Sequence, residues 1–274
     1  MWRVTWSRGL SSAARTRRRN VLAEWRRRRG GTGGRFTGGR SGTGTRGREP
    51  PPAEEEFELR LRRHGSGGFD LPGHSVLVGL IGANAAVYGL WQLPHTHEAY
   101  ASMQRHFMVS FGALAGGRAH TLLTHAFSHV DFAHVAMNMV VLYFFGSAAA
   151  QVLGGARFLA LYTGSALSGA VAQLAYNETR DDREARRKIP MLGASASVNA
   201  SVILSCILFP TRTVLLYFII PMPAALLGGL FVLKDLVGAY KGTGTVGNAA
   251  HLGGAAFGAA YYMHVRKLLV RVKV

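Results

Sequence analysis

Six apolar runs, separated by short polar stretches, occupy most of the chain between residues 75 and 265. They cover residues 75–93, 133–151, 158–176, 191–209, 213–233 and 249–265. Each is close to the roughly 20 residues with which an α-helix crosses about 30 Å of hydrocarbon. None contains Asp, Glu, Lys or Arg, so the charged outer faces of a soluble helical bundle are missing. The pattern predicts an all-α polytopic membrane protein with a six-transmembrane-helix bundle over residues 75–270.

Prolines and small residues add detail to these runs. Pro221 and Pro223 fall inside the fifth run and predict a kinked or broken helix, because proline lacks an N–H and clashes with the preceding turn. Gly254 and Gly258, four residues apart in the sixth run, predict close packing against another helix. Cys206 is the single cysteine, which excludes an internal disulfide, and we expect it to pack as a small apolar residue.

The first 50 residues differ in composition from the rest. They contain fourteen Arg, no Lys and two acidic residues, and so carry +12 (14 − 2) of the formal net charge of +18. This composition is typical of an organellar transit peptide, and a disordered basic tail is the alternative. We expect residues 1–50 to be a disordered or removed leader and residues 51–74 to be a linker or amphipathic segment. Nucleic acid is not an expected partner, because basic residues mixed with stacking aromatics on a folded surface are missing.

The charges of the loops predict an orientation. Six spans place both termini on one side of the bilayer, together with Arg157, Arg212 and the basic C-terminal tail. In the loop 177–190, on the opposite side, acidic residues nearly balance the basic ones. The asymmetry follows the positive-inside rule. We therefore expect a multi-pass protein of the mitochondrial inner membrane with its termini in the matrix, and a plastid membrane is the alternative.

Four polar side chains fall at equivalent positions in alternate runs. His134 and Asn138 lie near the start of the second run, Ser195 near the start of the fourth and His251 near the start of the sixth. Alternate spans run in the same direction, so these positions reach the same membrane depth and can form one shallow pocket. Burying a histidine in a span is unfavourable, and such a residue usually marks function. The set therefore predicts a functional site.

Acyl transfer is the chemistry that needs these groups. A serine hydroxyl becomes a nucleophile when a neutral histidine accepts its proton, which predicts Ser195 as nucleophile and His251 as general base. The oxyanion of the tetrahedral intermediate needs hydrogen-bond donors. The candidates are the side chains of His134 and Asn138 and the backbone N–H groups at the start of the fourth helix, where Gly193 and Ala194 are expected to meet the substrate backbone.

Residues near this set have plainer interpretations. No carboxylate lies within the six runs, which predicts a Ser-His dyad without a buried acid. Asp131, one turn before His134, is expected to cap the second helix, and a role as third member of a triad is the alternative. His125 and His129 have a spacing that suits a metal, but no third ligand is evident, and we expect them to be structural. Neither a metal nor a cofactor is expected.

The same residues resemble a known family. The stretches HAFSHVDFAHVAMNM (125–139), GASAS (193–197) and AHLGGAAFG (250–258) are similar, in order and in helix, to three signature segments of rhomboid intramembrane proteases, most of all in the mitochondrial presenilin-associated rhomboid-like branch. The resemblance runs from about residue 75 to 265. It implies that Ser195 is the nucleophile, His251 the base and His134 with Asn138 the oxyanion-stabilising pair. It also implies a transmembrane substrate that partly unwinds near the membrane face and approaches beside the fifth helix.

Several positions depart from the family's pattern. Ala196 stands where glycine often follows the nucleophile, and His120 with Thr121 stand where many members have Trp-Arg. Asn199 stands where some members carry an aromatic against the catalytic histidine, and its amide is expected to hydrogen-bond to His251 instead. No apolar run precedes residue 75, although the mitochondrial branch commonly has an extra helix there.

Two rival functions come from other classes. A catalytically inactive rhomboid-like protein would bind membrane clients without cutting them, but both Ser195 and His251 are present. A six-span transporter or channel would show internal repeats or polar residues at both membrane depths, whereas here the polar residues gather in one leaflet. The sequence therefore predicts an intramembrane serine endopeptidase whose partners are transmembrane substrates and the lipid bilayer, with its oligomeric state left open.

Overall fold

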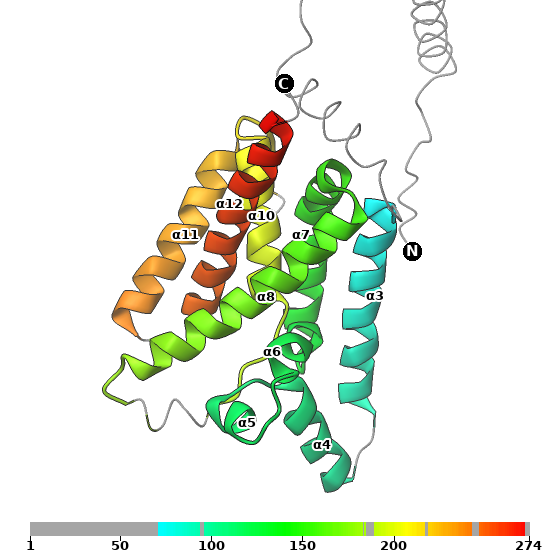
Figure 1. Ribbon diagram of the computed structural model, residues 1–274, viewed down its shortest axis with the longest axis vertical. Coiled ribbons are helices and arrows are strands. Elements are labelled where there is room, and N and C mark those ends of the chain that lie inside the picture. Colours follow the sequence, from blue (N-terminus) through cyan, green and yellow to red (C-terminus); the bar gives the residue numbers. More distant parts are fainter. Residues whose placement is uncertain are drawn as a thin grey trace, which may run out of the picture. The chain divides into compact units, whose positions relative to one another are not determined.

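The structure, a computed structural model, describes residues 71–93, 96–182, 184, 189–216, 219–242 and 247–271, the last five by their backbone alone. The predicted leader and almost all of the predicted linker lie outside these residues. The described chain contains six long helices, each overlapping one predicted run (Figure 1). They are α3 (Gly73–Gln92), α7 (Phe132–Leu153), α8 (Gly155–Glu178), α10 (Ser195–Leu208), α11 (Ala224–Lys241) and α12 (Asn248–Arg271).

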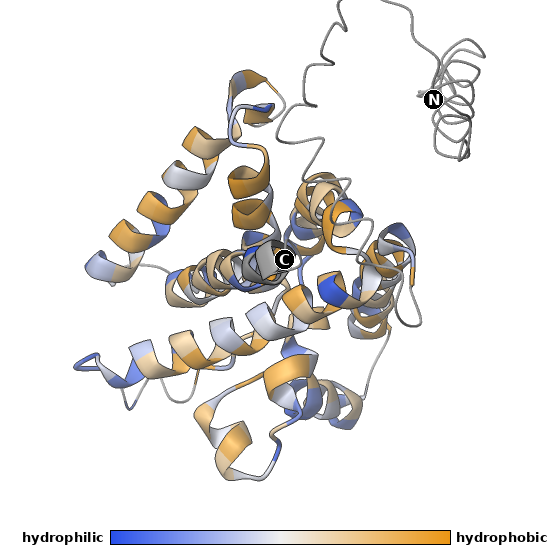
Figure 2. Ribbon diagram, turned by 45° about the horizontal axis from the view of Figure 1, so that its top comes forward, coloured by the Kyte–Doolittle hydropathy of each residue, from blue (hydrophilic) through white to orange (hydrophobic). Residues whose placement is uncertain are grey.

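Three of the described helices, α3, α7 and α8, are long and apolar enough to cross a membrane. α10 is apolar but has 14 residues, about 21 Å at 1.5 Å per residue. Large apolar side chains also face outward from α7 and α11, among them Phe144, 54% exposed, and Leu233, 56% exposed. Orange, hydrophobic positions recur along the long helices in Figure 2, and blue positions lie mainly in the connections. A lipid environment accounts for such surfaces on helices.

The fifth helix begins later than its apolar run predicts. Residues Thr213–Leu216 (β1) and Ile220–Pro223 (β2) form an antiparallel hairpin in which Thr213 pairs with Pro223 and Leu216 with Ile220. A residue that precedes proline is pushed into the extended region, and here Pro221 and Pro223 act on two alternate positions. The helix therefore starts at Ala224 and continues to Lys241. The predicted break is confirmed, but the predicted range 213–233 for this helix is wrong.

A group of short helices precedes α7, where no element was predicted. It consists of α4 (His97–Phe107), α5 (Phe111–Ala115), α6 (Thr121–Thr124) and the 3-10 helix η1 (His125–Phe127). The indole Nε1 of Trp91 at the end of α3 donates to Ser128 Oγ at 2.8 Å, and the Tyr162 hydroxyl of α8 donates to the Ala126 carbonyl at 2.9 Å. Val109 pairs with Met191, just before α10. These bonds attach the group to the long helices.

The helices α10 and α12 run parallel and touch through glycine. A Cβ on Gly254 would overlap the backbone of Ala196, and one on Gly258 would lie 2.7 Å from the Ala200 carbonyl oxygen. Gly254 meets Ala196 and Gly258 meets Ala200, so the contacts advance in the same direction along both helices, which therefore run parallel. The close packing predicted for Gly254 and Gly258 is confirmed, and it brings the first turns of the two helices together.

Candidate active site

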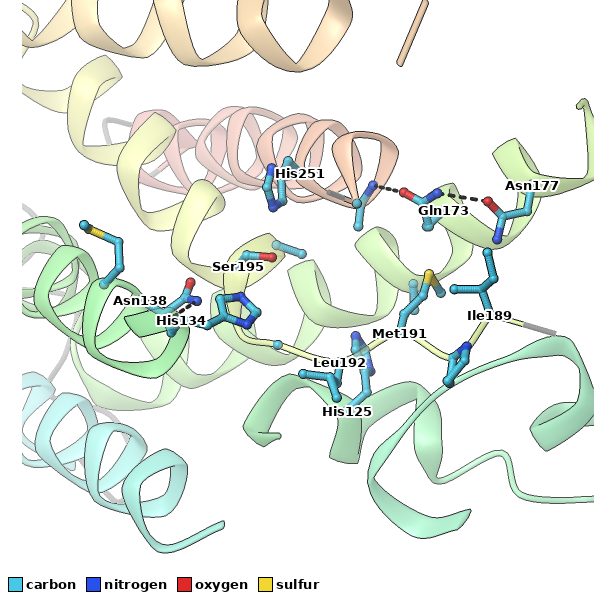
Figure 3. Close-up of a pocket in the computed structure, with 17 residues that line it drawn as sticks. His125, His134, Asn138, Gln173, Asn177, Ile189, Met191, Leu192, Ser195 and His251 are labelled. Atoms are coloured by element: carbon cyan, nitrogen blue, oxygen red, sulfur yellow. Dashed lines mark hydrogen bonds between the residues drawn. The ribbon is translucent and has the colours of Figure 1, made fainter. Parts of the chain in front are cut away.

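A pocket of about 660 Å³ opens among the first turns of α7, α10 and α12 (Figure 3). All four side chains of the predicted set line it: His134, Asn138, Ser195 and His251. Its opposite part is polar as well, because Gln173 Nε2 of α8 donates to Asn177 Oδ1 at 3.0 Å. These four residues come from three helices and are spread from residue 134 to residue 251, yet they line the same pocket.

Ser195 is the first residue of α10 and is partly buried. The chain enters the helix through Gly193, whose φ of +121° favours glycine and whose Cβ, if present, would lie 2.9 Å from His134 Cε1. The first intrahelical bond of α10 is donated by Val198 to the Ala194 carbonyl at 2.9 Å. The N–H groups of residues 195–197 therefore have no partner inside the helix.

His134 and Asn138 lie on α7, on the side of Ser195 away from His251 in Figure 3. Asp131 caps this helix by accepting from the His134 N–H at 2.9 Å, so the predicted cap is confirmed. The Asn138 amide donates to the His134 carbonyl at 2.9 Å. The rings of His134 and His129 meet edge to face with their centroids 4.9 Å apart. The His134 ring is thereby held next to Gly193.

His251 lies in the first turn of α12, and its side chain is 14% exposed. Gly254, one turn later, rests on the backbone of Ala196, the residue after Ser195. This contact sets the imidazole and the hydroxyl on the same pocket wall. Within the described residues no hydrogen bond joins the Ser195 hydroxyl to His251.

A buried carboxylate adjoins His251, contrary to the prediction that no acid is buried among the spans. Asp235 of α11 is 3% exposed, and its Oδ1 lies 3.2 Å from His251 Nδ1. Asn199 does not bond to His251 as expected; its Nδ2 donates to Asp235 Oδ2 at 3.4 Å. Asp235 was missed because the fifth run was ended at residue 233, two residues before it. The signal was a charged pair, Lys234 and Asp235, directly after an apolar run.

The backbone donors expected at Gly193 and Ala194 are already occupied. The Gly193 N–H donates to the His125 carbonyl at 2.9 Å, and the Ala194 N–H donates to His129 Nε2 at 3.3 Å. Ala194 is fully buried and does not line the pocket. The N–H groups without such a partner therefore begin at Ser195, two residues later than expected, because the N–H groups of Gly193 and Ala194 donate to His125 and His129.

His125 and His129 shape the start of α10 from outside the candidate spans. Both are buried, and burial lowers the pKa of each to about 4, the neighbouring His134 adding to the effect at His129. A neutral His129 is required for its Nε2 to accept from Ala194. No group of three or more His, Cys, Asp or Glu residues suited to a metal occurs in the described part of the chain. The prediction that these two histidines are structural fits their bonds.

Of the two residues that follow Ser195, Ala196 also lines the pocket, whereas Ser197 does not. The Ser197 hydroxyl is fully buried and donates to the Tyr162 carbonyl at 2.7 Å. The Ala196 methyl points at α8, where Gly169 leaves room for it. Cys206, 6% exposed, packs against Gly228, which agrees with its predicted role as a small packing residue. Ser195 is thus the serine of GASAS that lines the pocket.

Comparison with known proteins gives the family. Residues 116–268, more than half of the chain, match the Rhomboid domain. The chain is 36% identical over 220 residues to RHOMBOID-like protein 12, mitochondrial, of Arabidopsis thaliana, covering 77% of this chain and 64% of that protein. It is 34% identical over 206 residues to Rhomboid protein 1, mitochondrial, of Saccharomyces cerevisiae, covering 70% and 54%. It is 28% identical over 225 residues to the mitochondrial presenilin-associated rhomboid-like protein of Homo sapiens, covering 80% and 55%.

These alignments span about half to two-thirds of the length of the curated relatives. The matched domain contains all three signature segments from residue 125 to 258 and every residue that lines the pocket. The family resemblance seen in the sequence is therefore confirmed. The chain belongs to the rhomboid family.

Proposed function

We propose that this protein is an intramembrane serine endopeptidase that cleaves the transmembrane anchors of other membrane proteins. The observation that carries the proposal is the pocket shared by Ser195, His251, His134 and Asn138 at the first turns of three helices. Chance placement of polar residues in apolar helices would not direct four of them to one wall. A serine hydroxyl, an imidazole that can act as its base and a group of hydrogen-bond donors are what acyl transfer requires.

The proposed reaction proceeds through an acyl-enzyme. His251 accepts the proton of the Ser195 hydroxyl as Oγ bonds to the scissile carbonyl carbon, and it then donates that proton to the leaving amine. His134, the Asn138 amide and the N–H groups at the start of α10 stabilise the oxyanion. A water molecule, deprotonated by His251, attacks the acyl-enzyme and releases Ser195. Metal and cofactor have no part in these steps.

The proposal extends to the membrane. The six long helices form the six-span bundle, with the shorter α10 placed so that its first turn, and the pocket with it, lies below one bilayer surface. The other ends of α8 and α12 meet where the Tyr261 hydroxyl donates to the Arg157 carbonyl at 3.0 Å. Arg157, Arg212 and the basic C-terminal tail belong to that end, which by the positive-inside rule faces the matrix. The composition of the leader and the names of the three relatives support mitochondria as the organelle.

Reconstituted protein tests the activity. The wild type, Ser195→Ala and Ser197→Ala are placed in liposomes with a fluorogenic transmembrane anchor and, separately, treated with a fluorophosphonate probe. We expect cleavage and labelling of Ser195 in the wild type and in Ser197→Ala, and neither in Ser195→Ala. Cleavage by Ser195→Ala at the wild-type rate would reject the assignment. Anchor binding without cleavage by the wild type would favour an inactive, client-binding protein. Imaging of the tagged full chain distinguishes mitochondria from plastids.

A further inference from the structure

A carboxylate inside the helical bundle needs an explanation. Asp235 lies in an apolar helix and is 3% exposed. Ionisable residues at such positions are unfavourable and usually functional. A carboxylate that served only as the partner of a surface cation would gain more by reaching water with it. Lys234, 67% exposed at its side chain, has reached the surface, while Asp235 turns inward.

The two oxygens of Asp235 contact the two helices that carry the proposed nucleophile and base. Oδ1 faces His251 Nδ1 of α12 at 3.2 Å, and Oδ2 accepts from Asn199 Nδ2 of α10 at 3.4 Å. Asn199 lies one turn after Ser195 on the same helix. A further contact, Lys234 Nζ to Oδ1 at 3.4 Å, comes from outside. The carboxylate therefore has a separate inward donor for each oxygen.

Glycines of α11 allow this reach. A Cβ on Gly228 would lie 3.2 Å from Cys206 Sγ of α10, and one on Gly238 would overlap Asn248 at the start of α12. Both glycines lie on the face of α11 that also carries Asp235, seven residues after the first and three before the second. Close approach at these two points brings the short aspartate side chain up to the imidazole.

The geometry determines which ring nitrogen carries the proton. A carboxylate accepts only, so Nδ1 of His251 must donate to Asp235. In the neutral ring, Nε2 then keeps a free lone pair, which is the form that a general base needs. Without the acceptor, both tautomers would be populated and the ring would be free to turn.

We propose that Asp235 is a positioning residue that orients His251 and fixes its Nδ1–H tautomer, and that Asn199 in turn orients Asp235. The dyad of Ser195 and His251 thereby becomes a triad whose third member comes from the fifth helix. The inference rests on the proposed endopeptidase function. The acid of this triad is Asp235 and not Asp131, the alternative considered from the sequence, which caps α7.

Substitutions separate this role from a structural one. Asp235→Asn keeps the volume and removes the charge, and Asp131→Asn serves as the matched control because asparagine also caps helices. In liposomes we expect Asp235→Asn to lower kcat by about 100-fold or more with KM unchanged, since the analogous change in a soluble triad lowers kcat by about 10⁴. Asn199→Ala is expected to lower kcat by about 10-fold, because a hydrogen bond to a charged group contributes about 1.5 kcal/mol and each 1.36 kcal/mol is tenfold in rate. A kcat for Asp235→Asn within threefold of the wild type would overturn the proposal, as would an equal loss in Lys234→Gln.

A second measurement does not depend on cleavage. Solid-state NMR of wild-type protein labelled with ¹⁵N-histidine reports the tautomer of His251 at neutral pH, assigned through His251→Gln. We expect a protonated Nδ1 and an unprotonated Nε2, and the reverse pattern would overturn the proposal. Failure of the wild type and Asp131→Asn to cleave any anchor would reject the endopeptidase function, whereas this spectrum would still decide the role of Asp235.

Discussion

Gly254 of α12 lies directly against the backbone of Ala196 of α10, with no room for a Cβ between them. Three residues before Gly254 stands His251, and one residue before Ala196 stands Ser195. The position of the proposed base relative to the proposed nucleophile is therefore set by a contact between two helix backbones. Polar interactions such as that with Asp235 then orient a ring that packing has already placed.

Gly254→Ala is expected to separate the two helices and lower activity at least about 10-fold. Overpacking of a tight core also destabilises by about 1–3 kcal/mol. Gly229→Ala on α11 is the control, because a Cβ there meets nothing within 4 Å and Gly229 is likewise inside a helix. Anchor cleavage and thermal unfolding in detergent measure both effects. Equal behaviour of the two variants would contradict this account.

Gly193→Ala should reduce cleavage strongly. Its Cβ would press on the His134 ring at 2.9 Å, and its φ of +121° is strained for any other residue. Gly117→Ala separates the two causes, since Gly117 has a φ of +75° but open space around its Cβ. We expect Gly117→Ala to lose about 1 kcal/mol of stability with cleavage retained. Wild-type cleavage by Gly193→Ala would show that His134 does not need its present position.

Ser197→Ala should leave the chemistry intact. The hydroxyl donates to the Tyr162 carbonyl between α10 and α8, so its loss is expected to reduce stability by about 0.5–1.5 kcal/mol. Cleavage of the anchor at the wild-type rate, with a slightly lower melting temperature, is the expected result. Loss of activity equal to that of Ser195→Ala would mean that the two hydroxyls share the reaction.

Stability is expected to fall in mild acid. The pKa of His125 and of His129 is about 4 in the folded protein, against about 6.5 in the unfolded chain. Between these values the unfolded chain binds more protons, so the stabilisation is complete above about pH 6.5 and is lost as the pH falls toward 4. His129→Gln keeps an acceptor for the Ala194 N–H and removes one titrating group. Its melting temperature should depend less on pH than that of the wild type or of His264→Gln, an exposed control.

Asp131→Ala should cost about 1 kcal/mol of stability, because the carboxylate caps α7 at the His134 N–H. Asp131→Asn keeps a capping oxygen and should match the wild type in unfolding and in cleavage. If Asp131→Asn lost cleavage while remaining folded, the alternative of a catalytic Asp131 would return.

The sequence by itself determined the six helices, the family and the identity of the four pocket residues. Apolar runs without charge specify buried or lipid-facing helices where proline does not interrupt them, and successive spans alternate in direction, so the starts of alternate helices lie on one side. His134, Asn138, Ser195 and His251 could therefore be assigned to one pocket from the sequence. Runs interrupted by proline were less certain in their ends, as the hairpin at 213–223 shows.

The tertiary structure alone decided which groups touch. Asp235 became the partner of His251 because α11 starts after Pro223 and because glycines let it approach α10 and α12. The N–H groups of Gly193 and Ala194 donate to His125 and His129, which lie some 65 residues earlier in the chain. No local sequence pattern encodes such a contact. Hydrophobic periodicity determines which face of a helix is buried, but the atom that a polar side chain meets depends on the rotation and approach of its neighbours, and these arise only when the whole bundle packs.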